Sequence, residues 1–117
     1  MDEQWKKANK EINSLLEQGM AMDGFEKHYA EGVIMQENET EPRVGKALNR
    51  EQCGAFVKMF PDLKLKVLSA AYGDQVSIQE VLFDYTNEQG EKIRYPEVAV
   101  RHWENGLVVK EKFYYSS

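Results

Sequence analysis

The sequence predicts one α+β domain that spans residues 1–117, with three N-terminal helices packed on the concave face of a cone-shaped, curled antiparallel sheet. In the first half of the chain, apolar residues recur at steps of three and four, which is typical of amphipathic helices. After Pro61 the period changes to two, and short turn sequences separate four runs typical of strands. Helices followed by an antiparallel sheet indicate an α+β domain rather than a βαβ arrangement. Because long twisted strands must curl, helices on the concave side would leave a tapering cavity for a small ligand.

The first predicted helix carries an apolar stripe that runs from Trp5 to Met20. Asp2 is a good N-terminal cap, because its side chain can accept hydrogen bonds from the first backbone amides. Gly19 stands where this helix is expected to end, since glycine readily adopts the left-handed conformation that follows a helix.

Two more helices are predicted before Pro61. Asp23 is expected to cap a second, shorter helix that carries Tyr29 and breaks at Gly32. The third runs over Lys46–Phe60. Gly54 lies inside it at a cost of about 1 kcal/mol against alanine, which we interpret as a sign of close packing.

The strands are predicted from alternating apolar residues and from the turns between them. One strand follows the second helix, and four long strands after Pro61 form an antiparallel meander. Their predicted ranges are Val33–Glu39, Leu63–Tyr72, Val76–Thr86, Ile93–Trp103 and Leu107–Tyr115.

The composition is that of a globular, acidic protein. Hydrophobic residues make up 42% and charged residues 30% of the chain, which argues against disorder. A net charge of −5 without a basic cluster argues against binding to nucleic acid or an anionic membrane. No apolar run is long enough to span a bilayer, and the first residues lack the apolar centre of a secretory signal. We therefore predict a cytoplasmic location.

The predicted strand Val33–Glu39 has an unusual distribution of polar residues. Period-two alternation puts Val33, Met35, Glu37 and Glu39 on one face, so that carboxylates follow apolar residues on the same side. A surface strand would place the carboxylates opposite the apolar residues. This pattern favours a strand that lines a half-apolar pocket.

Three segments resemble the nuclear transport factor 2-like (cystatin-like) superfamily, in particular its SnoaL-like polyketide cyclase and ketosteroid isomerase branch. "FEKHYAEGVIMQEN" is similar to the family's helix, Tyr-Ala-acidic, then strand. "EPRVGK" before a helix and "RHWENGLVVKEKFYY" near the end resemble two later family segments. Their order and spacing cover nearly the whole chain. The resemblance implies a cone-shaped α+β fold, but not a function, because this fold carries enzymes, binders and dimerisation modules.

The resemblance also implies a position for a catalytic base. Aligning Tyr29-Ala30-Glu31 with the family pattern puts Glu37 where the isomerases carry their proton-abstracting aspartate. Apolar surroundings would raise the pKa of this carboxyl and make it a better base near neutral pH. Similar cyclases and isomerases need no cofactor, so none is implied here. Two histidines and one cysteine without metal-binding spacing also argue against a zinc site.

Two departures from the isomerases stand against that activity. The isomerases polarise the substrate carbonyl with a helix tyrosine and a late protonated aspartate, and the matching positions here are Asn13 and Ala99. Each such donor typically contributes about 2.7–4 kcal/mol, so a ketosteroid isomerase is not expected. Two functions stay open: a cofactor-free isomerase or cyclase acting on a small apolar carbonyl compound, and a non-catalytic ligand-binding or dimerisation module.

The family's strand phase points alternate residues of the last two strands into the cavity. With that phase, Ala99 and Phe113 face inward together with the charged and aromatic residues around them. The predicted substrate-binding set is Tyr29, Met35, Glu97, Arg101, Trp103, Glu111 and Tyr115.

The charged members of this set have two interpretations, because charged side chains are almost never buried unpaired. In the first, the carboxylates form an acid/base pair beside Arg101, which holds an anionic or carbonyl-bearing ligand. In the second, Arg101 neutralises Glu97 or Glu111 in an internal salt bridge. A one-residue slip of the strand would instead put Val98 and His102 inside.

The outer sheet face is predicted to form a symmetric homodimer interface. Apolar side chains on this face would rarely be left to water. The residues predicted to contribute to it are Tyr72, Tyr85, Val98, Val100 and Val108.

Overall fold

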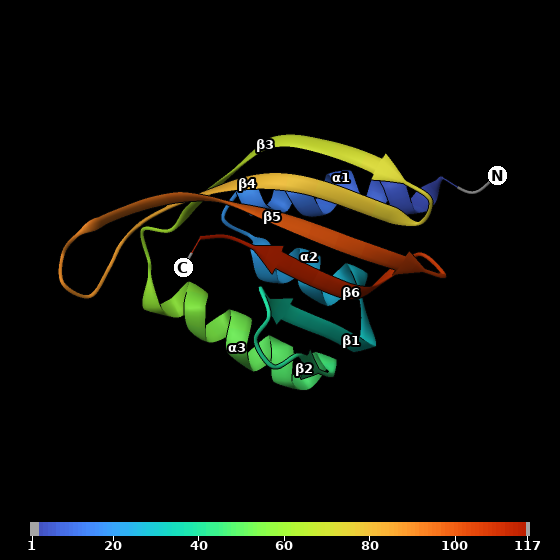
Figure 1. The fold of residues 1–117 in the computed structure, drawn as a ribbon, viewed down its shortest axis with the longest axis horizontal. Helices are drawn as coiled ribbons and strands as arrows, with labels where there is room; N and C mark the ends of the chain where they lie inside the picture. Colours follow the sequence, from blue (N-terminus) through green and yellow to red (C-terminus); the bar gives the residue numbers. More distant parts are fainter. Residues whose placement is uncertain (1–2, 117) are drawn as a thin grey trace.

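The computed structural model describes residues 3–116, which form three helices and a sheet of six strands (Figure 1). No helix in this range is both long and apolar enough to cross a membrane. The elements are α1 (Gln4–Glu17), α2 (Ala21–His28), β1 (Tyr29–Glu37), β2 (Arg43–Val44), α3 (Lys46–Met59), β3 (Lys64–Gly73), β4 (Val76–Thr86), β5 (Lys92–Glu104) and β6 (Leu107–Tyr114).

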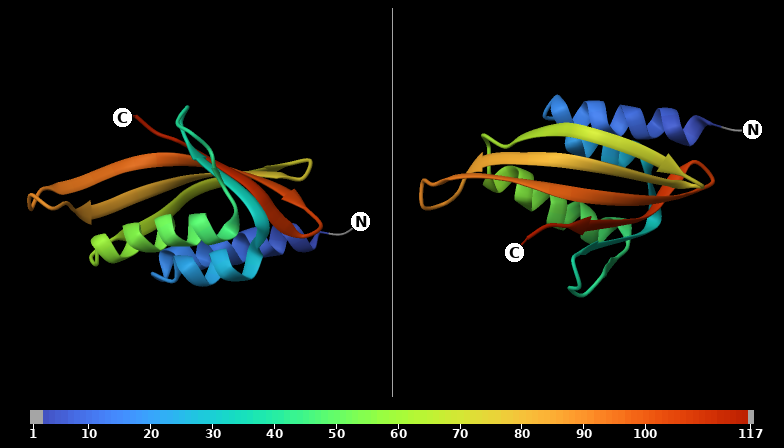
Figure 2. Two further views of the ribbon diagram at one scale, coloured as in Figure 1. Left: turned by 90° about the horizontal axis from the view of Figure 1, so that it is seen from below. Right: turned by 45° about the horizontal axis from the view of Figure 1, so that its top comes forward.

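The sheet has the strand order β2-β1-β6-β5-β4-β3 (Figure 1). Strands β3 to β6 form the predicted antiparallel meander. Strand β1 joins the far side of β6 and runs parallel to it, so the sheet contains one parallel pair. The sheet is curled, and all three helices lie on one of its faces (Figure 2). The predicted α+β class with helices on the concave face is confirmed.

Helix α1 ends at Glu17, and Gly19 terminates it two residues later, as the sequence predicts. Gly19 has a φ of +76°, and the backbone amides of Gly19 and Met20 donate to the carbonyls of Leu16 and Leu15. This pair of hydrogen bonds is a Schellman motif, which satisfies carbonyls that the helix leaves open. The predicted cap, Asp2, lies outside the described residues.

The boundary between α2 and β1 differs from the prediction. Helix α2 ends at His28, and Tyr29 is already extended and begins β1, so Gly32 lies within the strand. The pairing of β1 with β6 shifts register between Tyr29 and Ile34, and Tyr29 is buried. Asp23 does not cap α2 but lies in its first turn, where a carboxylate is favoured by the helix dipole.

The main core lies where α1 and α2 pack on one end of the sheet. Trp5, Ile12, Phe25, Val33 and Val108 are among its buried residues. Helix α3 contacts β1 and β2 at the opposite edge of the sheet. Because the helices cover the two edges, the middle of the concave face is left for a cavity.

The outer face of the sheet is apolar, but only partly through the predicted residues. Val98 and Val100 lie on it, beside exposed Ile78 and Tyr114. Three other predictions were wrong, because the side chains concerned lie on the inner side. Tyr72 packs against Trp5, Tyr85 packs against Phe56 and Phe60, and Val108 is fully buried.

The interpretation of Gly54 as a close-packing position was wrong, since nothing would lie within 4 Å of an added Cβ. We therefore predict that Gly54→Ala raises the free energy of unfolding by roughly 0.5–1 kcal/mol, because alanine loses less conformational entropy in a helix. Denaturant unfolding measures this change. Gly106→Ala is the matched control: Gly106 has a φ of +79°, so alanine there should lower stability. Equal effects at both positions would contradict the different backbone roles of the two glycines.

Candidate functional site

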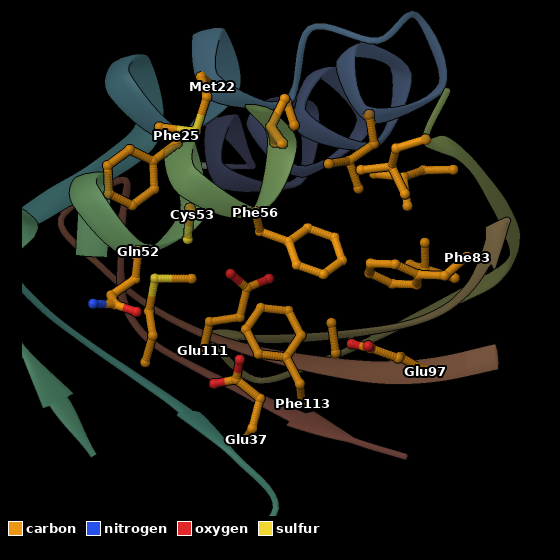
Figure 3. A pocket seen from close by; sticks show the side chains of 18 of the residues that line it. Met22, Phe25, Glu37, Gln52, Cys53, Phe56, Phe83, Glu97, Glu111 and Phe113 are labelled. Carbon is orange, nitrogen blue, oxygen red and sulfur yellow. The ribbon is translucent and has the colours of Figure 1, made fainter. Parts of the chain in front are cut away.

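A cavity of about 420 Å³ opens between the concave face of the sheet, α2 and α3 (Figure 3). Its size lies in the range that takes a small organic ligand. Most of its wall is apolar or aromatic. Its charged side chains all come from the sheet, and Gln52 of α3 is a further polar group. The apolar wall includes Met22 and Phe25 of α2, Cys53, Phe56, Val57 and Met59 of α3, and Met35, Val81, Phe83 and Phe113 of the sheet.

A buried ion pair forms one part of the wall. Arg101 Nε donates to Glu111 Oε2 over 2.8 Å, and both side chains are almost fully buried. Tyr29 Oη donates to the other carboxylate oxygen of Glu111 over 2.6 Å. Arg101 Nη1 donates to the side-chain oxygens of Asn9 and Asn13 of α1. Of the two interpretations of these charges, the internal salt bridge therefore holds for Arg101 and Glu111.

Trp103 shares the inward phase of β5 but does not line the cavity. Its indole Nε1 donates to Ser77 Oγ over 3.0 Å, and its ring lies 5.8 Å from the ring of Trp5. Helix α1 covers this end of β5 and fills the space that a ligand would need. The structure therefore does not bring Trp103 to the cavity with the other predicted site residues.

Glu37 lies on the cavity wall at the end of β1, but in different surroundings from those expected. Its carboxylate forms an ion pair with Arg43 Nη1, and a third of its side chain is exposed. The sequence predicts a desolvated carboxyl at this position. Instead, Glu37 lies at the solvated side of the cavity beside the guanidinium of Arg43.

Arg43 is held in place by Asn49, which is fully buried. Arg43 Nε donates to Asn49 Oδ1 over 3.1 Å. The amide nitrogen of Asn49 in turn donates to the carbonyls of Val33, Arg43 and Gly45. The guanidinium that faces Glu37 is thus fixed by the backbone around β2.

Glu97 is the buried carboxyl without an ion-pair partner. It is 7% exposed and lines the cavity from β5, and no cation of residues 3–116 forms a salt bridge with it. Burial raises the pKa of Glu97 to about 7. The Tyr95 hydroxyl offsets part of this shift, whereas the charges of Glu37 and Glu111 add to it. Near neutral pH this carboxyl can therefore donate or accept a proton.

Aromatic residues line the same part of the cavity as this carboxyl. Phe83 and Tyr95 are stacked with ring centroids 5.5 Å apart, and Tyr115 lies 5.9 Å from Tyr95. Phe56 of α3 approaches Phe83 edge-on. Figure 3 shows Glu97 beside Phe83, with Glu37 on the other side of Phe113.

Seven of the eight predicted site residues line this cavity, Trp103 being the exception. The inward strand phase is confirmed, because burial alternates along β5 with Glu97, Ala99 and Arg101 inside.

Arg43 was not among the predicted site residues, although it lies in the segment "EPRVGK". The two buried asparagines of α1 were not predicted either, and their i,i+4 spacing on an apolar stripe is a usable signal for a buried polar contact.

Thiolate chemistry and metal binding have little support in the cavity. Burial raises the pKa of the Cys53 thiol to about 12, so the reactive thiolate is scarce at neutral pH. Within residues 3–116, no group of three or more His, Cys, Asp or Glu side chains is arranged to hold a metal ion.

Solved structures with the same architecture were found, whereas no family model and no curated protein matches the sequence. An NTF2-like protein of unknown function from Burkholderia pseudomallei superposes with a TM-score of 0.84 at 11% identity, over 98% of this chain and 92% of that one. The chain has the nuclear transport factor 2-like fold. A protein named as a SnoaL-like polyketide cyclase from Jannaschia sp. CCS1 matches with a TM-score of 0.83 at 11% identity, over 94% and 83% of the two chains.

An epoxide hydrolase-like protein from M. tuberculosis is also similar, with a TM-score of 0.78 at 8% identity over 97% of this chain and 83% of that one. Proteins with different names thus share this NTF2-like and SnoaL-like architecture. At these identities the likeness concerns the fold, and the chemistry must be argued from the cavity itself.

The buried Glu97 carboxyl should make stability depend on pH. Its pKa is raised to about 7 in the folded protein from 4.5 when solvated, so the folded state binds more protons between these values. The free energy of unfolding therefore falls as pH rises through this window. We predict that Glu97→Gln is more stable than the wild type by roughly 2–3 kcal/mol at pH 8, and similar to it at pH 4.5.

Denaturant unfolding at the two pH values measures this difference. Glu41→Gln is the control. Because Glu41 is exposed, this variant should have the same free energy of unfolding as the wild type at both pH values. If Glu97→Gln were destabilising at pH 8, the carboxylate would have a stabilising partner in the folded state.

Proposed function

We propose that the protein is a cofactor-free enzyme that transfers a proton on a small, mostly apolar carbonyl compound. The observation that carries this proposal is the buried Glu97 carboxyl, without an ion-pair partner among residues 3–116, in an apolar cavity that also contains the ion-paired Glu37. One of these carboxyl groups is buried in an apolar wall and the other is paired with a cation near solvent, which is the contrast in surroundings that an acid/base pair uses.

In this mechanism Glu97 is the acid. The aspartate that polarises the carbonyl in the isomerases has no counterpart, because Ala99 stands at its position. Glu97 lies two residues earlier on the same inward face of β5 and is buried. In its protonated form it can donate a hydrogen bond to a carbonyl oxygen and stabilise the charge that develops there. It thereby supplies a donor in place of the missing aspartate.

Glu37 is the base in this mechanism, as the sequence predicts. Its carboxylate lies on the cavity wall within reach of a bound ligand, and its ion pair with Arg43 fixes its position there. Strand β6 separates β1 from β5, which puts the two carboxyl-bearing strands about 10 Å apart across the cavity floor. A small ketone lying over Phe113 would reach both groups. Tyr29, Met35, Arg101, Glu111 and Tyr115 would shape its binding site.

Exchange of α-hydrogens for deuterium tests the proposal without knowledge of the natural substrate. We predict that the protein accelerates exchange of at least one ketone from a panel of small cyclic ketones in D₂O, followed by NMR. The rate should fall as pH rises through about 7, because Glu97 then loses the proton with which it binds the carbonyl. Glu37→Gln should lower the rate roughly 10²- to 10⁴-fold.

Glu97→Gln separates the two ways in which Glu97 could act. Glutamine still donates a hydrogen bond but does not titrate, so this variant should keep part of the rate and lose the alkaline decline. Glu97→Leu should lose both. A rate that rises through pH 7 in the wild type would instead make Glu97 the base.

The second candidate function is a non-catalytic small-ligand binder. It is favoured by the engagement of Arg101, the cation of the inner wall, with Glu111, Asn9 and Asn13 rather than with the open cavity. Absence of exchange with every ketone, together with ligand-induced NMR shifts in the cavity, would support this function. The cytoplasmic location stays a prediction from the sequence.

We further propose that the chain forms a homodimer through the outer face of β4, β5 and β6. Ile78, Val98 and Tyr114 are exposed apolar side chains at its centre. Two charged residues flank this apolar centre. On the β4 side Glu80 is paired with Val98, and on the β6 side Lys112 is paired with Val100. A two-fold axis along the strands would bring the acidic side of one copy over the basic side of the other, which favours this pairing.

Light scattering during size-exclusion chromatography tests the dimer. We predict a dimer at tens of micromolar, and a monomer for Val98→Glu, because the new carboxylates would face each other across the interface. Val44→Glu is the matched control, since Val44 is exposed on β2 outside this face. A monomeric wild type, or an equal effect of both variants, would contradict the proposed interface.

A further inference from the structure

The charged groups of the cavity are unequal in number. Three carboxyl groups, Glu37, Glu97 and Glu111, share the wall with two guanidinium groups, Arg43 and Arg101. Glu37 pairs with Arg43, and Glu111 pairs with Arg101. Glu97 is left without a counter-ion among residues 3–116, although it is more than nine-tenths buried. When Glu97 is ionised, the cavity therefore lacks one positive charge.

The surroundings of Glu97 suit a positive charge that arrives with a ligand. Tyr95 precedes Glu97 by two residues on the same face of β5, and Phe83 is stacked on Tyr95. Tyr115 follows Tyr114, the partner of Val98, and so reaches the other side of Glu97. Aromatic faces attract cations through their quadrupoles, and the attraction grows when water is excluded. A carboxylate among such faces is a site for an ammonium group.

We propose that Glu97, Phe83, Tyr95 and Tyr115 form a binding site for the cationic head of a small apolar amine or quaternary ammonium compound. The ammonium group would supply the missing positive charge, and its apolar body would occupy the rest of the cavity towards Phe56 and α3. This inference does not rest on the proposed proton transfer. A bound cation would hold Glu97 ionised and thus remove the acid on which that reaction depends.

Binding of a cation should be coupled to the protonation of Glu97 and not to that of its neighbours. The carboxylates on β1 and β6 and the arginines on β2 and β5 are already paired. Burial raises the pKa of the Tyr29, Tyr95 and Tyr115 phenols and of the Cys53 thiol, so these groups do not titrate near neutral pH. The pKa of Glu97 is raised to about 7, so its charge changes between pH 6 and 8.

Calorimetry with benzyltrimethylammonium tests the site, since the charge of this probe does not change with pH. The affinity should rise about tenfold from pH 6 to pH 8, because only the ionised Glu97 binds the cation. At pH 6, measurements in phosphate and in MES, two buffers with different ionisation enthalpies, should show release of nearly one proton per bound cation. Equal affinity at the two pH values, or no proton release, would overturn the proposal.

Glu97→Gln is the decisive variant, and its circular dichroism spectrum shows whether it folds. It should bind the cation at least tenfold more weakly at pH 8 and lose the pH dependence, whereas Glu41→Gln should bind like the wild type. Choline should bind at least tenfold more tightly than its uncharged carbon analogue, 3,3-dimethylbutan-1-ol. Unchanged binding by Glu97→Gln, or equal binding of choline and the alcohol, would overturn the site. These are binding measurements, so their failure is distinct from a failure of the exchange assay.

Discussion

The buried pair of Arg101 and Glu111 is the interaction on which the rest of the fold depends. The two residues lie directly opposite each other on β5 and β6, and the same pair receives a hydrogen bond from Tyr29 at the start of β1 and gives two to α1. Four elements therefore meet in one set of charged contacts. Leaving one member of a buried pair without its partner typically costs about 3–5 kcal/mol, so any shift in register of these strands would be strongly disfavoured. The packing of the inner wall of the cavity follows from this single register.

The three cavity carboxylates show how one wall can give identical groups different chemistry. Glu111 lies deep beside an arginine, Glu37 lies near solvent beside another, and Glu97 lies among aromatic rings without either. The three groups therefore differ only in environment: one is a buried structural partner, one is ion-paired near solvent, and one is buried without a cation among residues 3–116 and has its pKa raised to about 7. Ionisation of Glu97 lowers stability at neutral pH. Such a cost in stability is common for residues of functional sites and rare for residues that serve only packing.

Most of the fold and of the site's outline follows from sequence, for identifiable reasons. Strict alternation along β5 fixes which face is buried, so the inward placement of Glu97 and Arg101 could be predicted. The partners of these residues could not. Arg43 meets Glu37 only because a strand of two residues folds back onto β1, pairing Met35 with Arg43. Trp103 obeys the same alternation as Glu97, but α1 covers its end of the strand, and alternation carries no information about what lies above a face.

The parallel pairing of β1 with β6 has a consequence for how the chain is made. Asn9 and Arg101, which hydrogen-bond to each other, are 92 residues apart in sequence. Strand β1 likewise pairs with β6, which is synthesised much later. At a synthesis rate of about 5–20 residues per second, the first helices emerge several seconds before the strands that bury them. Topologies dominated by such distant contacts fold slowly, because loop closure precedes the stabilising contacts. During synthesis, the apolar stripes of the first helices therefore lack the strands that bury them until β6 has been made.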